Sequence, residues 1–418
     1  MNRSEPPGQL VESGTGGLMA LFERVVFVCA LAFVFTVPWE NAVRISGFGT
    51  ISRAVGIPLI GAWLLLMLSA GRIRRLHEFH IGAMLFVFWC ALTLLWSANL
   101  DLTFQQAKTF VQLLASLLII WAVVDTPDRS RGLLQAFVLG AAVTAALVIY
   151  NHSVGNVTRW TQRASIEGVD ENDVALVMAI ALPAAWYLAT GKRSGLGRYH
   201  LGVLNLVYVP LGLIAIIMTG SRGGFASTIP FYLYVIYSTG TQRFRTKLAL
   251  MLAAGVVATL VTLYAPEVPL QRITTTFDEI GSGNISGRGG IWLQGLEVWL
   301  EGGVFSIVGI GSGGYMWTIG RVAHSTPISV LVETGLIGLS ILALSLLLLF
   351  RATLRSLPAE RAVGVTILLI WLIGINALSW EYRKPTWIVW SMIICVSVAH
   401  RRDVHDEQVL ESTAPDRA

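Results

Sequence analysis

The sequence predicts an all-α membrane protein that crosses the bilayer about twelve times. Of its 418 residues, 54% are hydrophobic and only 13% are charged, and the mean hydropathy is +0.66. Soluble domains carry about 25% charged residues, so this composition excludes an ordinary soluble protein. The apolar residues form continuous runs of about 20, the length of a spanning helix, and not the period-two alternation of a membrane β-barrel.

Twelve such runs follow one another along the chain. Their centres lie near residues 29, 61, 89, 115, 141, 182, 209, 232, 256, 338, 370 and 392. The run at 225–238 is short, and the run at 385–399 has Lys384 and Pro385 at its start, so these two helices have the least sharply defined ends. The first run is too long for a signal peptide and lacks a small-residue cleavage site, so we expect it to remain as an anchor.

The distribution of basic residues predicts that both termini lie in the cytoplasm. Every second connection is rich in Lys and Arg, as short cytoplasmic loops are. These stretches are GRIRRLHEFH, DRSRG, GKRSGLGR, TQRFRTK, RATLRSLPAER and HRRDVH. The net charge of +5 therefore reflects membrane orientation, and no nucleic-acid partner is expected. Polar segments 1–18 and 400–418 are expected to be disordered cytoplasmic tails that flank one transmembrane domain, 19–399.

The longest connection, about 265–326, is predicted on the outer face between the ninth and tenth helices. Long loops without secondary structure are uncommon and are usually functional. Here GRGGIWLQGLEVWLEGG places Trp292, Leu296, Trp299 and Leu300 on one helical face. This spacing predicts a helix at the membrane interface or an amphipathic packing helix. GIGSGG at 309–314 lacks the strand–helix–strand context of a dinucleotide site, so a tight turn is expected there.

Basic residues on the outer face oppose the positive-inside tendency, and they therefore point to a function. They are Arg159, Arg163, Arg222, Arg288, Arg321, Arg383 and Lys384. One interfacial arginine often only reaches lipid phosphates, but several facing one compartment favour a site for a lipid-linked phosphate or diphosphate. Arg222, in TGSRGG, is the clearest case, because its glycines permit close backbone approach and the next helix start could bind an anion.

A histidine and a carboxylate are the second set of candidates. His324, in RVAHSTPISVLVETGLIG, directly precedes a helix that Ser325 or Thr326 would cap, with Pro327 in its first turn. Imidazole is easily poised as a base near neutral pH, although a solvent-facing loop histidine is the simpler interpretation. Glu333 lies inside the same apolar helix, so we expect it to pair with an arginine or with His324.

No metal or cofactor is expected from the sequence. It has no His/Cys spacing typical of a metal site and no phosphate-binding loop that ends in lysine. The acidic run DEND at 170–173 fits a helix start better than a set of metal ligands.

Four motifs, in this order, resemble the O-antigen ligase and polymerase superfamily. They are TGSRGG, GRGGIW, GIGSGGY and AHSTPISVLVETGLIG. RASIEGVDENDVALVMAIALPAAW is similar to the family segment that leads into the sixth helix, so the resemblance covers roughly residues 160–350 and the helix layout. The sequence departs from the family at Ser325, where asparagine is frequent.

The resemblance implies a bacterial inner-membrane glycosyltransferase that works at the periplasmic face without a metal. Its donor would be an undecaprenyl diphosphate-linked oligosaccharide, and its acceptor a hydroxyl of a glycan or of lipid A-core. Arg222 and Arg288 would stabilise the leaving diphosphate, and His324 would take the acceptor proton or orient that hydroxyl. The remaining candidates for substrate contact are Arg159, Arg163, Arg321, Glu333, Arg383 and Lys384.

Two reactions of the family fit the sequence, and one other class competes with them. Ser325 slightly favours a polymerase over an O-antigen ligase. The alternative is a transporter of an anionic or lipid-linked solute, which would show charged or broken segments near the bilayer midplane.

Overall fold

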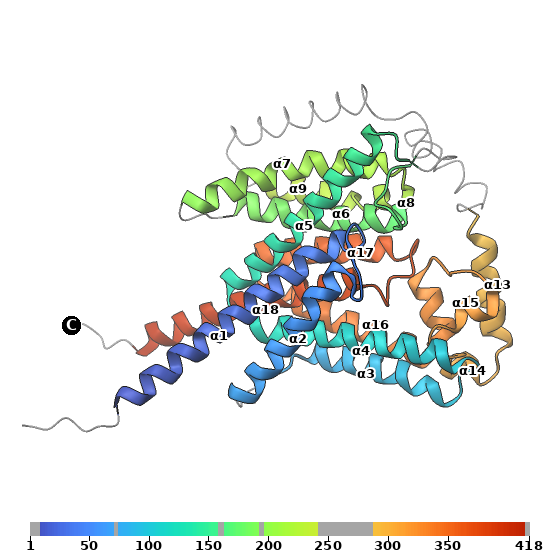
Figure 1. Cartoon of the computed structure of the whole chain (residues 1–418), viewed down its shortest axis with the longest axis horizontal. Coiled ribbons are helices and arrows are strands. Elements are labelled where there is room, and N and C mark those ends of the chain that lie inside the picture. The colour runs from blue at the N-terminus through green and yellow to red at the C-terminus, as the bar shows by residue number, and fades with distance from the viewer. Residues whose placement is uncertain (1–8, 71–73, 158–162, 192–195, 241–286, 414–418) are drawn as a thin grey trace, which may run out of the picture.

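In a computed structural model, the chain forms a bundle of long helices with one small hairpin (Figure 1). The structure describes residues 9–70, 74–157, 163–191, 196–240 and 287–413. Within these ranges, eight helices are long and apolar enough to cross a membrane. They are α1 (Gln9–Thr36), α2 (Ile51–Ala70), α3 (Glu78–Leu92), α4 (Leu100–Val123), α5 (Pro127–Ser153), α6 (Glu171–Thr190), α7 (Leu196–Met218) and α16 (Thr326–Leu354). The chain is therefore an α-helical membrane protein with several spans.

Three further helices have apolar stretches that are shorter than those of the eight spans. They are α9 (Ile229–Thr239), α17 (Pro358–Gly374) and α18 (Lys384–Thr413), whose apolar part ends at Ala399. Every expected helix centre falls within a described helix except the one near residue 256. That helix, and the large loop up to residue 286, lie outside the described residues, so the total of twelve spans stays a prediction.

Helix extends into both segments that we expected to be disordered. α1 begins at Gln9, shortly after Pro7, and α18 continues to Thr413, shortly before Pro415. No proline, the residue that most strongly excludes helix, interrupts either stretch. The described helices therefore extend into parts of both segments, and their assignment as disordered tails stays a prediction.

The two ends of the described chain lie at the same end of the bundle (Figure 1). α1 begins there and α18 ends there, while α13 (Gly289–Glu301), α14 (Phe305–Val308) and α15 (Gly314–Ile319) lie at the opposite end. We call these three helices the cap, and the end of the bundle where they lie the cap end. The described part of the large loop is thus opposite both ends of the chain, as the basic connections predict.

α13 is the helix predicted from the tryptophan spacing, and its tryptophan face packs against protein. The indole N–H of Trp292 donates to the carbonyl of Ala323 (2.9 Å), and that of Trp299 donates to the carbonyl of Ser306 (2.9 Å). Leu300 is exposed on the helix. The packing interpretation is confirmed, and the exposed leucine leaves an interfacial position open to the same helix.

Near the cap end, α1 connects to α2 through a short hairpin. A 3₁₀ turn, η1 (Val37–Trp39), is followed by β1 (Arg44–Ile45) and β2 (Gly49–Thr50), which pair antiparallel. These two-residue strands do not change the helical class of the fold.

α6 is the central helix of the bundle. Within its apolar span, 83% of the residues are buried, against 17% for α2 at the periphery. Helices α5, α7, α9 and α17 pack around it, together with the short α8 (Arg222–Ala226). Because α6 is enclosed on all sides, the polar residues at its start are held in fixed positions at the cap end.

α16 is broken at Gly335, which has φ 69° and ψ −172°. A Cβ on this residue would overlap the carbonyl of Ile307, so only glycine fits the contact. The break frees the carbonyls of residues 332–334 from their helical partners. They accept hydrogen bonds from Ile310 N (3.1 Å), Gly311 N (3.0 Å) and Trp89 Nε1 (2.8 Å). A broken helix is tolerated inside a membrane only when its backbone groups are satisfied in this way.

The expected tight turn in GIGSGG is confirmed. Gly309, Gly311 and Gly313 all have positive φ, a conformation that L side chains rarely adopt. The turn lies against the break in α16 and fastens the cap to the bundle.

Candidate functional site

The start of α6 is the foundation of the site. Asp170 caps the helix, because its Oδ1 accepts hydrogen bonds from the backbone N–H and the side-chain amide of Asn172, both at 2.7 Å. The DEND run is therefore a helix start, as predicted. The same contact leaves the Asn172 carbonyl oxygen facing two other segments of the chain.

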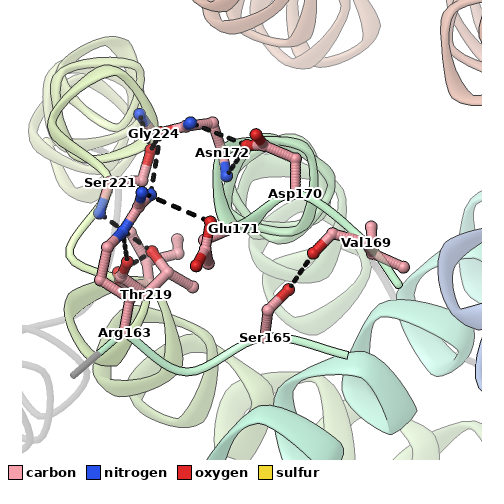
Figure 2. Close-up of polar contacts among 10 residues, drawn as sticks. Arg163, Ser165, Val169, Asp170, Glu171, Asn172, Thr219, Ser221 and Gly224 are labelled. Carbon is pink, nitrogen blue, oxygen red and sulfur yellow. Dashed lines mark hydrogen bonds and ion pairs between the residues drawn. The ribbon is translucent and has the colours of Figure 1, made fainter. Parts of the chain in front are cut away.

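Arg163 joins the loop before α6 to the end of α7 (Figure 2). Its Nε donates to the carbonyl of Thr219 (2.7 Å), its Nη2 donates to Oδ1 of Asn172 (3.1 Å), and its Nη1 lies 3.3 Å from Glu171 Oε2. The Arg163 side chain is only 12% exposed. Its charge is thus held at a defined place and is not free to reach lipid headgroups at random.

Arg222 follows the turn that ends α7. Ser221 caps the short α8 by accepting from the N–H of Gly224 (3.1 Å), and its hydroxyl donates to Oδ1 of Asn172 (2.7 Å). One asparagine oxygen therefore accepts from both Arg163 and Ser221, so the two arginine-bearing segments share an anchor. Arg222 itself is half-buried.

The glycines of TGSRGG serve packing within the protein. A Cβ on Gly224 would overlap Ala175 of α6, and a Cβ on Gly223 would lie 3.1 Å from that of Ala377. The predicted close approach is present, but it brings α8 against α6 and the α17–α18 connection. Since the Gly224 amide is already bonded to Ser221, the expected anion site on these amides is not formed by that group.

Arg288 enters from the start of α13. Its Nη1 donates to the carbonyl of Ala377 (2.8 Å), the residue against which Gly223 packs. Burial lowers the pKa of Arg288, the carboxylate of Asp170 partly opposes this effect, and the positive charges of Arg163 and Arg222 add to it. The guanidinium groups of Arg163 and Arg222, from two other segments, are therefore close enough to Arg288 to affect it.

His324 completes the cluster from the start of α16. It is half-buried, and with φ 49° it is the single non-glycine residue with positive φ among those that the structure describes. Two residues after His324, Thr326 donates two hydrogen bonds to the α17–α18 connection. Its backbone N–H donates to Ile375 O (2.9 Å), and its hydroxyl donates to Leu378 O (2.9 Å). The strained backbone at His324 is thus fixed from both sides, since Ala323 also accepts the indole N–H of Trp292. Such strain is concentrated at functional sites.

The electrostatic surroundings keep His324 neutral near pH 7. Burial lowers the pKa of its imidazole, the positive charge of Arg288 lowers it further, and Asp170 opposes the shift. A neutral imidazole can accept a proton, so the ring is suited to act as a base.

Taken together, Arg163, Arg222, Arg288 and His324 form one cluster at the cap end. The acidic groups beside it are Asp170, which is exposed, and Glu171, which pairs with Arg163. Guanidinium groups gathered in this way favour an anion with several oxygens, because a guanidinium group forms charge-assisted hydrogen bonds with such oxygens.

The structure does not bring every predicted substrate-contact residue to this cluster. Lys384 forms an ion pair with Glu40 and donates to Ser52 (2.9 Å), on the side of α2. Arg383 is 51% exposed and lies 3.8 Å from Asp173. Arg321 is exposed in the loop before His324, and Arg159 lies outside the described residues.

The partner predicted for Glu333 is wrong. Its carboxylate accepts hydrogen bonds from the backbone N–H groups of Gly313 (2.8 Å) and Tyr315 (3.2 Å), at the start of α15. It therefore caps a short helix of the cap, with backbone amides in place of an arginine or His324. Carboxylates at helix starts are stabilised by the partial positive charge there.

Sequence reasoning missed Asp170, Asn172 and the α17–α18 connection as parts of the site. Trp380 in that connection donates its indole N–H to Asp173 (2.7 Å), so the segment is tied to the first turn of α6. The sequence signal for these residues was the acidic run directly before an apolar helix. It indicates where the helix starts, but not which distant segments contact that start. Within the described residues, no three His, Cys, Asp or Glu side chains lie together as metal ligands would.

Comparison with known proteins gives no match: no protein-family model matches the chain, and no curated protein is similar to it in sequence.

Proposed function

We propose that the chain is a protein of the bacterial inner membrane that transfers an oligosaccharide from undecaprenyl diphosphate to an acceptor hydroxyl. The reaction takes place at the cap end of the bundle. The observation that supports this most strongly is that Arg163 and Arg222 lie near Arg288, and that Arg288 in turn lies near the half-buried imidazole of His324. A lipid-linked diphosphate presents several anionic oxygens at the membrane surface, and in this proposal the cap end, with these side chains, lies at that surface. The cap end would then face the periplasm, as the basic connections predict.

In the proposed reaction, the acceptor oxygen attacks the anomeric carbon of the donor. The bond between that carbon and the diphosphate oxygen breaks, and the diphosphate leaves with its electron pair. Arginines whose positions are already fixed before the reaction stabilise the charge that develops on this leaving group. The acceptor proton passes to the neutral imidazole of His324, which typically contributes a rate factor on the order of 10²–10⁴.

Within this reaction class, we favour a polymerase that extends a lipid-linked glycan. The reason is Ser325. At this position, ligases of the superfamily that the sequence resembles often have asparagine. A ligase that transfers the glycan to lipid A-core is the close alternative, with the same donor and the same arginines.

A transporter of an anionic or lipid-linked solute is the other candidate, and the break at Gly335 is the feature in its favour. The carbonyls that the break frees are satisfied by the glycine turn and Trp89, and Glu333 is bound to backbone amides. The break therefore offers a solute few open polar groups. The cluster of Arg163, Arg222, Arg288 and His324 lies instead at one end of the bundle, which favours a surface reaction.

The test is glycan transfer by purified protein with a lipid-linked donor and a glycan acceptor. A new glycosidic bond should form at the same rate with and without a chelator, and His324→Ala should nearly abolish it. Movement of labelled donor across vesicles without any new bond would replace the transferase with the transporter. His324→Ala activity close to wild type would remove the base and leave positioning and charge stabilisation as the catalytic means.

A further inference from the structure

A second basic site lies away from the arginine–histidine cluster, in a groove between α2 and α4. The groove has a volume of about 270 Å³ and is also lined by Phe33 of α1 and by residues 382–384 at the start of α18. α2 is the least buried of the eight spanning helices, so it stands apart from α4 and leaves this space.

The end of the groove nearer the cap is positively charged. Three basic side chains and one carboxylate line it there: Arg53, Arg383, Lys384 and Glu40. Glu40 is paired with Lys384. Arg53 is exposed and makes no hydrogen bond or ion pair with any described residue, and the contact of Arg383 with Asp173 is long, at 3.8 Å. Two guanidinium groups therefore remain accessible to an anion.

The rest of the groove is mostly apolar. Its floor contains buried Leu59, Leu113 and Ile119, and Ile57 (53% exposed) and Ile60 (37%) form its rim. From Gln112 to Ile119, α4 rises about 10 Å, which is two thirds of the roughly 15 Å that one leaflet contributes to the hydrocarbon core. A hydrocarbon chain from one leaflet fits this depth.

Gln112 marks the boundary between these two regions. Polar residues recur along α4 from Asp101 to Gln112, and the helix is almost entirely apolar beyond it. The Gln112 side chain is exposed, lines the groove and has no hydrogen-bond partner among the described residues. An amide on a spanning helix needs such a partner, and a polar group of a bound lipid would provide one.

We propose that this groove binds an anionic phospholipid of the cap-side leaflet, with its phosphate at Arg53, Arg383 and Lys384 and one acyl chain between α2 and α4. An anionic headgroup is complementary to the surplus of basic over acidic side chains, and the rim of the groove opens toward lipid. The site requires only that the chain spans a membrane, so it does not depend on the proposed reaction.

The test uses the full chain, reconstituted into vesicles of equal parts phosphatidylglycerol and phosphatidylcholine and then analysed by native mass spectrometry. Wild-type protein should retain phosphatidylglycerol in preference to phosphatidylcholine. Arg53→Ala should reduce that retention about fivefold, the factor that one basic residue contributes at an anionic lipid surface. Ser116→Phe, which fills the apolar part of the groove, should reduce it as well. Arg44→Ala, an exposed arginine of the hairpin that does not line the groove, is the control and should match wild type.

A second measurement guards against misfolded variants: added phosphatidylglycerol should raise the thermal unfolding midpoint of wild type and of Arg44→Ala, but not of Arg53→Ala. Equal retention of the two phospholipids by wild type would overturn the proposal. So would unchanged phosphatidylglycerol retention in both groove variants. Displacement of phosphatidylglycerol by polyprenyl phosphate at equal concentration would assign the groove to the isoprenoid lipid instead.

Discussion

The guanidinium of Arg288 donates a 2.8 Å hydrogen bond to the backbone carbonyl of Ala377. This bond joins the start of α13 to the α17–α18 connection, on the same residue that packs against Gly223 beside Arg222. Side chains that are far apart in the sequence thereby meet at one point of the cap end. Because the bond uses a backbone carbonyl, Arg288 keeps its full charge for a ligand.

The backbone at His324 gives a prediction that is independent of any reaction. A left-handed conformation costs a non-glycine residue roughly 1–2 kcal/mol, and glycine does not incur this cost. His324→Gly should therefore be more stable than His324→Ala by about 1–2 kcal/mol, although both lack the imidazole. Thermal or denaturant unfolding of the two purified variants measures the difference. Equal stabilities would mean that the backbone is relaxed at this position.

The pH dependence of transfer should show a neutral imidazole as the base. Since burial and Arg288 lower the pKa of His324, activity should persist below the range where an ordinary histidine becomes protonated, and then fall as pH drops through the lowered pKa. Asp170→Asn removes the carboxylate that opposes this shift, and asparagine still caps α6. The acidic limb of kcat/KM should therefore move to lower pH in this variant. An acidic limb that stays in place or moves to higher pH would show that the charge of Asp170 does not raise the pKa of His324.

The contact between the glycine turn and the broken helix predicts a large difference between two glycine substitutions. Gly309 and Gly320 both have positive φ, but a Cβ on Gly309 would overlap the backbone of Glu333, whereas Gly320 faces open space. Gly320→Ala should cost only backbone strain, and Gly309→Ala should be less stable by a further 1–3 kcal/mol or so. Unfolding midpoints in detergent compare the two. Equal losses would show that the turn can move away from α16.

The orientation of the bundle can be tested with single cysteines in a variant that lacks the three native ones. Ser153→Cys and Thr318→Cys lie on exposed positions toward the cap end, and Ala359→Cys lies on an exposed position in the first turn of α17, at the opposite end. An impermeant thiol reagent added to intact spheroplasts should label the first two and not the third. Labelling of Ala359→Cys alone would reverse the bundle and move the arginine cluster into the cytoplasm.

Much of the fold could be predicted because a spanning helix is encoded locally. A continuous apolar run in the sequence indicates the position and approximate length of a spanning helix, so the described helices lie where the sequence predicts them. Helix at residues 9–18 and 400–413 was not predicted because these residues are polar, and polarity alone does not distinguish helix from disorder. The break at Gly335 was missed for another reason. It depends on a contact between α16 and the turn at 309–314, and the sequence does not show that these two segments meet.

The site was predictable only in part. Arg222, Arg288 and His324 could be identified because a charge beside an apolar helix is costly and therefore conspicuous in the sequence. Asn172 could not, because the groups that bind its oxygen, on Arg163 and Ser221, belong to other segments. The partners of Glu333 are backbone amides, which carry no residue type and so leave no trace in a sequence.

Binding of the donor lipid tests the diphosphate site most directly. Labelled undecaprenyl diphosphate would be titrated against purified wild type, Arg222→Lys, Arg288→Lys and His324→Ala, with undecaprenol as the uncharged ligand. Arg351→Lys, an exposed arginine at the far end of the bundle, is the matched control. Each site lysine keeps the charge but loses the paired hydrogen bonds, which are individually worth about 1.5–3 kcal/mol, so the Kd should rise tenfold or more. His324→Ala and the control should bind as wild type does, and undecaprenol should bind weakly throughout. Wild-type affinity in both Arg222→Lys and Arg288→Lys would contradict a diphosphate site at this cluster.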